Sequence, residues 1–423
     1  MKIAIIGAGI IGITTAYELA VDGHEVTVFE RRGAAAEETS FANAGVVAPG
    51  SVTPWAAPGM PGKVLGNLMS RHAAVKLSWP LSTGDLAWMW KWWRACKLET
   101  YLANRARLQR LAFYSRERLH HITAELQLDY DRAGGYTVLL RTEKDSRMVQ
   151  PGLVVLRDAG VHFSEIDAEA VRKIEPAINP DTEFLGGIHL PQDEVANCRQ
   201  FALMLKDVAR GIGVNFEFNS TVAQLNRAQA AIVLIVNSNS GQGESRSFDA
   251  VVVCAGLASS ALLKPLGLRI PMAAVYGYSI SAPIREPLNA PRSALMDERY
   301  KVAISRLGNR VRVAGSAELG GSLAGRRASS IQTLYKVLHD WFPGAVQHAN
   351  TGASVQVWKG ARPMLPDGPP IIGASGTPGV WLNLGHGSSG WALSCGSARA
   401  LADQIAGEKP DIDMSGLDIG RLP

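Results

Sequence analysis

Residues 2–30 read KIAIIGAGIIGITTAYELAVDGHEVTVFE, and this stretch decides the fold of the first part of the chain. Lys2 to Ile6 is a short isoleucine-rich run, which is typical of a buried parallel strand. Ile10 to Val21 has the periodicity of a helix, and Glu25 to Glu30 alternates as a second strand. The chain is therefore expected to begin with a β–α–β unit.

Three glycines occupy the turn between this strand and helix with the spacing G-x-G-x-x-G. The first permits a tight bend, the second lets the backbone approach a pyrophosphate, and the third lets the helix pack closely on the strand. The helix N-terminus offers N–H groups to phosphates, and the acidic residue ending the second strand suits a ribose diol. The pattern predicts a dinucleotide site with an unphosphorylated ribose, formed by Gly7, Ala8, Gly9, Ile11, Gly12, Glu30 and Arg31.

FAD and NAD both bind this fingerprint, and three features favour FAD. The fingerprint lies at the very start of the chain, and Phe248 to Gly256 is a second buried strand that ends in Ala255-Gly256. Gly385 to Trp391 is a glycine-rich loop that leads into a helix. The N-terminus of such a helix stabilises an anionic reduced flavin. An NAD-dependent dehydrogenase is the alternative, and this last loop argues against it.

Composition narrows the class of protein. The chain has 423 residues, 47% hydrophobic and 19% charged, which is the balance of a globular protein with about two or three domains. The net charge of +5 is not gathered into long basic runs, so we expect no nucleic-acid binding. The four cysteines lie far apart without metal-ligand spacing, which predicts neither a metal site nor a disulfide, and a cytoplasmic location.

The rest of the chain alternates between helical and strand-like segments. A Gly/Pro/Ala-rich segment without clear periodicity covers Thr39 to Pro61, and loops of that length are usually functional or disordered. We expect helices in Leu81–Leu126, Arg199–Gly211, Ser330–Trp341 and Ser388–Ala406, and strands in Tyr136–Leu140, Val214–Phe218, Thr221–Val236, Met272–Ala317 and Pro378–Leu384.

Several longer motifs resemble one family of flavoproteins. They are ETSFANAG at 38–45, PWAAPG at 54–59, GYS at 277–279, YKVAISR at 300–306, RPMLPDG at 362–368 and NLGHG at 383–387. On these marks the chain resembles the D-amino acid dehydrogenase family (small subunit), a bacterial branch related to D-amino acid oxidase, glycine oxidase and sarcosine oxidase. The resemblance runs from Met1 to about Arg421, and in combination the motifs are far more specific than the glycine fingerprint.

The resemblance implies an α/β fold (α+β overall) of the D-amino acid oxidase type, with two discontinuous domains. A Rossmann-like FAD-binding domain would take 1–60, 150–262 and 355–423, and an antiparallel-sheet substrate domain would take 61–149 and 263–354. The flavin is expected to be noncovalent, because no cysteine sits at a position assignable to a covalent link. Further cofactor contacts are expected at Ser40, Asn43, Ala44, Gly45, Val222, Ala255, Gly256, Gly385, His386, Gly387, Ser388, Ser389 and Gly390.

The resemblance also implies the chemistry, which is oxidation of D-amino acids to imino acids that hydrolyse to 2-oxo acids and ammonia. Electrons would pass to a quinone or another respiratory acceptor. Arg362 is the expected partner of the substrate carboxylate, since a guanidinium matches a carboxylate as a bidentate fork. Tyr278 and Tyr300, expected on strands of the substrate sheet, are candidates to donate a hydrogen bond to that carboxylate; the alternative is that they are core tyrosines.

Five tryptophans lie between residues 79 and 93, together with Lys91 and Arg94. Aromatic residues interleaved with basic ones suit a membrane interface or a partner surface, while a helix packing its tryptophans into the core is the favoured interpretation. Peripheral attachment to the inner face of the cell membrane is therefore left open beside a purely cytoplasmic location.

Two alternatives for the function stay open at this point. One is an oxidase or dehydrogenase of the same fold that acts on D-proline, hydroxyproline, sarcosine or glycine. The other is a flavin-binding subunit of a larger complex with little catalysis of its own; Arg362, Tyr278 and Tyr300 argue against it, because such a subunit has no need of them.

Overall fold

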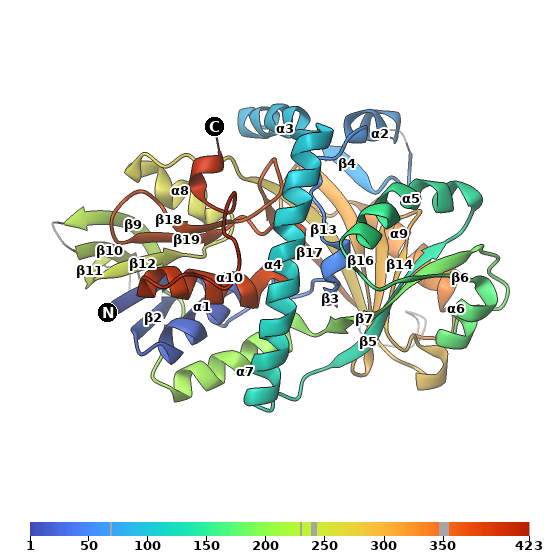
Figure 1. Ribbon diagram of the computed structural model, residues 1–423, viewed down its shortest axis with the longest axis horizontal. Helices are drawn as coiled ribbons and strands as arrows, with labels where there is room; N and C mark the ends of the chain where they lie inside the picture. Colours follow the sequence, from blue (N-terminus) through green and yellow to red (C-terminus); the bar gives the residue numbers. More distant parts are fainter. Residues whose placement is uncertain (68–69, 229–230, 238–242, 347–354, 423) are drawn as a thin grey trace.

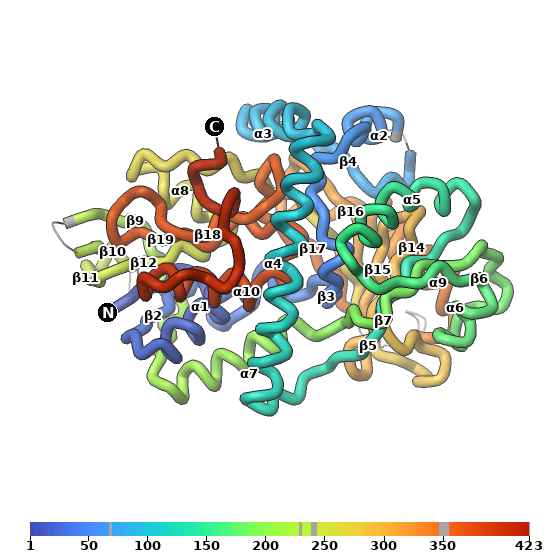
Figure 2. The backbone as a smooth tube through the Cα atoms, viewed as in Figure 1, coloured from blue at the N-terminus to red at the C-terminus, as the bar shows by residue number. Residues whose placement is uncertain are grey.

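The computed structural model describes residues 1–67, 70–228, 231–237, 243–346 and 355–422. The last residues of the expected substrate domain, 347–354, lie outside the described residues. Two sheets form the body of the molecule, one on each side of the long helix α4 (Leu98–Glu125), as Figure 1 shows. In Figure 2, the N-terminus and the C-terminus lie on the same side of α4.

The first sheet is built around the N-terminal β–α–β unit. In the described chain it has six strands in the order β18-β19-β12-β1-β2-β8, and β1 pairs in parallel with both of its neighbours. Four of its five β1 residues are buried, as expected for a central parallel strand. The strands are β1 (Lys2–Ile6), β2 (Glu25–Phe29), β8 (Asn215–Glu217), β12 (Ala250–Val253), β18 (Ile371–Ala374) and β19 (Val380–Leu384).

Helices pack on this sheet through a buried ion network. Helix α1 (Ile10–Val21) packs between α7 (Cys198–Gly211) and α10 (Gly390–Ala406), and α10 packs on α4. The fully buried carboxylate of Glu18 on α1 accepts hydrogen bonds from Arg118 on α4 at 2.7 Å and from Arg399 on α10 at 2.9 Å. A small antiparallel sheet covers the other face with β9 (Thr221–Ala228), β10 (Ala231–Asn237) and β11 (Gly243–Phe248).

The second sheet is larger and mainly antiparallel. It has ten strands among the described residues, with the path β17-β13-β16-β15-β14-β5-β7-β3 and with β4 and β6 paired to β16 and β7. Its strands are β3 (Val46–Val47), β4 (Val75–Ser78), β5 (Arg132–Leu140), β6 (Ser164–Asp167), β7 (Gly186–Ala196), β13 (Ala273–Pro283), β14 (Ala294–Asp297), β15 (Val302–Leu307), β16 (Arg310–Gly320) and β17 (Gln356–Met364).

Shorter helices surround this second sheet (Figure 1). Helix α9 packs on β13 and β16, where Trp341 is fully buried, and α3 packs on the far part of β13. These helices are α2 (Met60–Asn67), α3 (Thr83–Ala95), α5 (Glu143–Asp158), α6 (Ala168–Ile174) and α9 (Ala328–Trp341). Helix α8 (Ala258–Leu263) lies instead on the side of the first sheet, next to β9.

The sequence-based elements agree with the structure at most positions and differ in a few. The N-terminal strand and helix have the expected bounds, whereas α5 and β7 fall in a region where no element was expected. The domain boundaries stay a prediction. Strands β3, β6, β7 and β17 lie in ranges expected for the cofactor domain, yet they pair into the ten-stranded sheet.

Gly12 offers a direct test of how tightly the first unit packs. A Cβ at Gly12 would lie 1.9 Å from the backbone oxygen of Gly7, whereas a Cβ at Gly211, in α7, meets nothing within 4 Å. We predict that Gly12→Ala lowers the free energy of unfolding by about 3 kcal/mol through overpacking. Gly211→Ala is the matched control and should leave it unchanged or raise it slightly. Urea denaturation of both variants measures the difference; equal stabilities would contradict the packing described.

Candidate functional site

A cavity of about 930 Å3 lies where the two sheets meet. Its wall takes residues from the glycine turn after β1, the segment after β2, the inner face of the ten-stranded sheet and the loop before α10. A volume of that size is at the upper end of the range for cofactor and ligand sites. It brings together residues from nearly the whole length of the chain.

The glycine turn has the geometry that its spacing predicts. Gly7 has φ +104°, and a Cβ there would lie 2.7 Å from the oxygen of Cys254. Gly7, Gly9 and Ile11 line the cavity, while Ala8 and Gly12 support the turn from behind. The bare backbone of this turn leaves room for a pyrophosphate at the N-terminus of α1.

Glu30 stands beside this turn and faces the cavity. Its Oε2 accepts from the N–H of Ala8 and its Oε1 from the N–H of Arg32, both at 2.8 Å. Arg31 also lines the cavity, but its guanidinium forms an exposed ion pair with Glu38 at 2.6 Å. The Glu30 carboxylate is therefore held in place by the backbone and keeps acceptor capacity for a ribose diol.

The segment from Thr39 to Gly45 crosses between the two sheets. Ser40 Oγ accepts from the N–H of Ile10 at 3.0 Å, which satisfies one of the unpaired groups at the start of α1. Asn43 Oδ1 accepts from the N–H of Gly45 at 3.0 Å. The cavity wall includes all four residues predicted in this segment, namely Ser40, Asn43, Ala44 and Gly45.

Side chains of the ten-stranded sheet hold the carbonyl groups of the same segment. Ser279 donates to the oxygen of Ala42 at 2.9 Å and Ser305 to that of Ala44 at 2.7 Å. Arg312 donates to the oxygen of Asn43 at 3.1 Å, and burial lowers the pKa of Arg312 to about 10. The segment is thus fixed against the sheet.

The loop before α10 forms another part of the wall. Gly385, His386, Gly387, Ser388, Ser389 and Gly390 all line the cavity, as do Val222, Ala255 and Gly256. Residues Gly387–Ser389 form a short 3-10 turn that continues into α10, so the first N–H groups of that helix have no partner within it. A helix start of this kind favours negative charge on a bound group.

His386 itself is buried and hydrogen-bonds through Nε2 to Ser397 Oγ at 3.1 Å. Burial lowers its pKa to about 3, so the imidazole is neutral near pH 7. The side chain therefore shapes the turn, and the backbone of the following residues faces the cavity. Together the glycine turn, Glu30 and this loop fit a flavin dinucleotide: a ribose acceptor, an open pyrophosphate cradle and a positive helix start.

The ten-stranded sheet forms the floor of the cavity, and the side chains at the centre of that floor are small. One row across it runs Val138, Met296, Ala303, Ala314, Ser279 and Trp358, each paired with the next on neighbouring strands. Ala303 and Ala314 line the cavity at the centre of the row, and Gly315 and Ser316 follow them. Small residues at these positions leave space above the sheet for a substrate.

Arg362 lies beside this floor on β17. Its Nη1 donates to the oxygen of Ser316 at 3.0 Å, and the guanidinium lies over Gly277, where a Cβ would come within 2.3 Å of Nη2. Burial lowers the pKa of Arg362 to about 10, which still leaves it charged near neutral pH. Within the described part of the chain, no carboxylate pairs with it. A cation that faces a cavity without a counter-ion is ready to bind an anion.

Tyr278 lies on β13 and lines the cavity, but its hydroxyl is already engaged. It donates to the buried carboxylate of Glu318 and accepts from the N–H of Arg327 at 3.1 Å. Burial raises the pKa of Tyr278, and the hydrogen bond to Glu318 adds to the shift. Its ring packs with Val302, Val313 and Trp341 in the core between the sheet and α9, and its hydroxyl braces the sheet.

The expectation for Tyr300 is contradicted by its position. It lies in the turn between β14 and β15, not on a strand, and it is outside the cavity wall. Its ring packs against the guanidinium of Arg141 at 5.2 Å and the imidazole of His72 at 6.0 Å. The next residue, Lys301, has φ +52°, and this tight turn directs Tyr300 away.

Sequence reasoning missed three residues that line the same part of the cavity. Tyr136 on β5 is buried, and its hydroxyl makes no hydrogen bond with any described residue. Glu298 and Lys301 line the wall from the turn between β14 and β15, as an ion pair. The alternation of Tyr136 and Val138 on one strand was the available signal for Tyr136.

Across the described ranges, no group of three or more His, Cys, Asp or Glu side chains is placed to hold a metal. In the same ranges, no helix has the length and apolarity needed to cross a bilayer.

We predict that buried His386 makes stability fall with acid. Its folded pKa is about 3, below the ordinary value of 6.5, so the unfolded chain binds more protons between these values. Stability from this group is present above about pH 6.5 and is lost as pH falls toward 3. Between about pH 7.5 and about pH 5.5, which lie on either side of the ordinary histidine pKa, the urea concentration at the unfolding midpoint should fall. This fall should be smaller in His386→Gln than in the wild type.

The exposed His121 on α4 supplies the control for this measurement. His121→Gln should keep the pH dependence of the wild type. A midpoint in His386→Gln that falls as steeply as in the wild type would contradict the prediction.

Comparison with known proteins agrees with this geometry. The family model described as FAD dependent oxidoreductase matches residues 2–404. A D-amino acid dehydrogenase of Bradyrhizobium diazoefficiens is 40% identical over 100% of this chain and 99% of that protein. Another D-amino acid dehydrogenase, from Rhizobium rhizogenes, is 40% identical over 100% of this chain and 100% of that protein.

Solved structures show the same fold. Glycine oxidase from Geobacillus kaustophilus matches with a TM-score of 0.74 and 20% identity, covering 100% of this chain and 99% of that one. L-Proline dehydrogenase from P. horikoshii matches with a TM-score of 0.71 and 15% identity over 99% and 96%. With a family model that spans most of the chain and full-length relatives at 40% identity, the chain belongs to the FAD-dependent oxidoreductase family, as an enzyme related to the D-amino acid dehydrogenases.

Proposed function

We propose that this enzyme oxidises D-amino acids to imino acids, which hydrolyse to 2-oxo acids and ammonia. The hydride leaves the α carbon of the neutral amine form, and bound FAD supplies its acceptor at N5 of the flavin. The two electrons then pass to a quinone or another respiratory acceptor. The D-amino acid substrate rests on the names of the relatives that are 40% identical to this chain.

Arg362 is the single observation that carries the proposal. It is a charged group beside the small side chains at the centre of the floor, and no described carboxylate neutralises it. A substrate carboxylate would complete this pair and fix the amino acid by two parallel hydrogen bonds. The hydrogen bond from Nη1 to Ser316 limits the rotation of the guanidinium, so the carboxylate would be held in one orientation.

The main contributions of the protein are then to position the substrate and to exclude water, and not to act as an acid or a base. Ala303 and Ala314 form an apolar wall beside the space next to Arg362. Such a wall excludes water and strengthens the ion pair to the substrate. Hydride transfer from a neutral amine needs no nucleophile in the protein, because the nitrogen lone pair stabilises the developing cation.

The cofactor residues support noncovalent binding. The cavity wall contains Cys254, and burial raises the pKa of its thiol to about 12. Cys198 has the same shift to about 12 for the same reason. A thiol that stays protonated is a poor nucleophile, so neither residue is suited to form a bond with the flavin.

The proposal is tested by anaerobic mixing of the FAD-loaded enzyme with a panel of substrates. We expect D-alanine to bleach the absorbance band of the oxidised flavin and L-alanine to leave it unchanged. Acid precipitation should release the flavin into solution. Bleaching by sarcosine, glycine or D-proline alone would contradict D-alanine as a substrate and assign one of these other amines, oxidised by the same chemistry. An enzyme that binds FAD and responds to none of these would overturn the proposal in favour of a binding subunit.

We predict that Arg362→Met lowers kcat/KM for D-alanine by about a hundredfold to a thousandfold, since it removes one partner of a buried ion pair. The kcat/KM of Arg362→Lys should lie between those of the wild type and Arg362→Met, because an ammonium cannot form the bidentate fork. Dye-coupled steady-state kinetics measures both, with FAD content checked by absorbance.

Arg306 on β15 provides the matched control, since its guanidinium bonds to carbonyl groups of Gly308 and Pro287 outside the cavity wall. Arg306→Lys should keep kcat/KM within about twofold of the wild type. Full activity in Arg362→Met would rule out the assigned role.

A further inference from the structure

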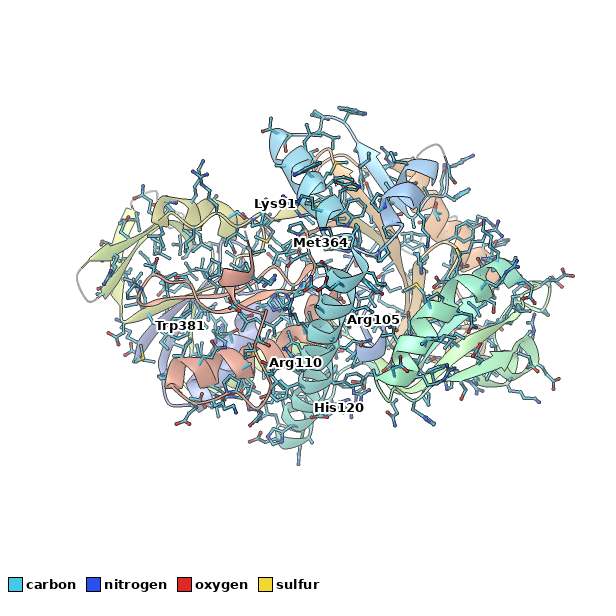
Figure 3. The ribbon with its side chains drawn as sticks, turned by 45° about the horizontal axis from the view of Figure 1, so that its top comes forward. Lys91, Arg105, Arg110, His120, Met364 and Trp381 are labelled. Atoms are coloured by element: carbon cyan, nitrogen blue, oxygen red, sulfur yellow. The ribbon has the colours of Figure 1, made fainter. Side chains whose placement is uncertain are left out.

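Helix α3 closes one end of the cavity floor. Trp88 Nε1 donates to the oxygen of Met364 at 2.9 Å, and Figure 3 labels Met364 at the end of β17. Trp88 stacks with Trp92, with centroids 6.4 Å apart, and both pack on this end of the sheet, as favoured from the sequence. That interpretation is wrong for Trp90 and Trp93, which are 57% and 54% exposed. Core side chains therefore cover the floor at this end.

The open part of the floor runs the other way from Arg362. The guanidinium lies over Gly277 on β13 and donates to Ser316 on β16. The sheet continues from β16 to β15 and β14, and the turn between these last two strands brings Lys301 and Glu298 to the cavity wall. Neighbouring strands lie about 4.8 Å apart, so β13 and β14 are separated by about 14 Å. A substrate held by Arg362 would have room for a long side chain in the direction of Glu298.

The alternation of β14 fixes the direction in which Glu298 faces. Leu295 packs in the core against α9, and Asp297 accepts from Trp341 of α9 at 2.7 Å. Met296 and Glu298 therefore face the opposite side, where both of them line the cavity. The Glu298 side chain is 11% exposed, so its carboxylate is largely removed from water. A carboxylate in such a place needs a cation or hydrogen-bond donors as partners.

Tyr136 adds a polar group to the same end of the cavity. It lies on β5, which pairs with β14, and it is 3% exposed. Its ring packs with Leu190 and Ala294, while its hydroxyl makes no hydrogen bond with any described residue. Burial raises the pKa of Tyr136, and the negative charge of Glu298 raises it further. The hydroxyl and the carboxylate are thus electrostatic neighbours.

The ion pair between Glu298 and Lys301 is open to exchange. The Lys301 side chain is 58% exposed, whereas that of Glu298 is 11% exposed. An ion pair with an exposed lysine contributes little to stability, because water solvates the released ammonium well. A second cation that reaches Glu298 through the cavity can therefore replace Lys301 at small cost.

We propose that Glu298 and Tyr136 bind the end of a long cationic side chain, so that this enzyme prefers D-lysine and similar diamino acids to apolar D-amino acids of the same length. This inference rests on the proposed function. With the substrate carboxylate on Arg362, the apolar part of the side chain crosses Ala303 and Met296. Its ammonium then donates to the carboxylate of Glu298 and to the hydroxyl oxygen of Tyr136. The side chain of D-alanine is too short to reach either group.

The experiment compares dye-coupled kcat/KM of the FAD-loaded enzyme for D-lysine and for D-norleucine, which lacks only the terminal ammonium. We expect D-lysine to be the better substrate by about tenfold, the effect of a hydrogen bond to a charged group. Glu298→Gln should bring the two values within about twofold of each other. Tyr136→Phe should lower the preference for D-lysine about threefold.

Two further variants complete the set. Lys301→Gln should raise kcat/KM for D-lysine about twofold to fivefold and leave that for D-norleucine unchanged, because it frees Glu298. Glu169→Gln is the control, since Glu169 forms an exposed ion pair with Lys173 on α6, outside the cavity wall. It should keep the preference of the wild type. Equal kcat/KM for both substrates in the wild type, or an equal loss for both in Glu298→Gln, would overturn the inference.

Binding without turnover separates this inference from the proposed function. The probe ε-aminocaproate has the carboxylate and the ammonium of lysine but no α-amino group, and caproate has the carboxylate alone. In the wild type, ε-aminocaproate should perturb the flavin spectrum at about tenfold lower concentration than caproate, and in Glu298→Gln at a similar concentration. If no D-amino acid reduces the dye but this difference is present, the proposed function fails and the cation site stands. If D-alanine reduces the dye but neither comparison favours the cation, this inference alone fails.

Discussion

The segment from Thr39 to Gly45 joins the two sheets, and the cavity depends on that junction. Ser40 completes the start of α1 on one side, while Ser279, Arg312 and Ser305 bind three successive carbonyl groups on the other. Thr39 also donates to the oxygen of Ala361, next to Arg362. Because these three successive carbonyl groups each have a partner, the segment has little freedom to move. The glycine turn and Arg362 are therefore held at fixed positions relative to one another.

Small residues make this arrangement possible on the substrate side. Because Gly277 has no side chain, the Arg362 side chain can lie flat across β13. The small side chains of Ala303 and Ala314 leave the space above the sheet open. The buried group of Glu318, Tyr278 and Lys359 braces the strands beneath, with Lys359 at 3.4 Å from Glu318. Burial acts to raise the pKa of Glu318, but hydrogen bonds from Ser78 and Tyr278 and the charge of Lys359 lower it, so the carboxylate stays ionised.

Local patterns in the sequence predict the parts of this structure that depend on local geometry. The glycine turn, the loop before α10 and Arg362 on β17 lie where their motifs place them, because each is set by residues a few positions apart. Tyr300 was misplaced since the turn at Lys301 cannot be told from a strand by alternation alone. The outward direction of Trp90 and Trp93 depends on which face of α3 meets β13, and that contact is made by residues far away in the chain.

A crystal structure of the enzyme with FAD and an unreactive carboxylate analogue of a D-amino acid would test the account most directly. We expect the ribose diol at Glu30, the pyrophosphate at the turn from Gly7 to Gly12 and the flavin pyrimidine at the start of α10. The carboxylate of the analogue should bind Arg362, with both oxygens bonded to the guanidinium. A carboxylate bound elsewhere, with Arg362 still bonded only to Ser316, would contradict it.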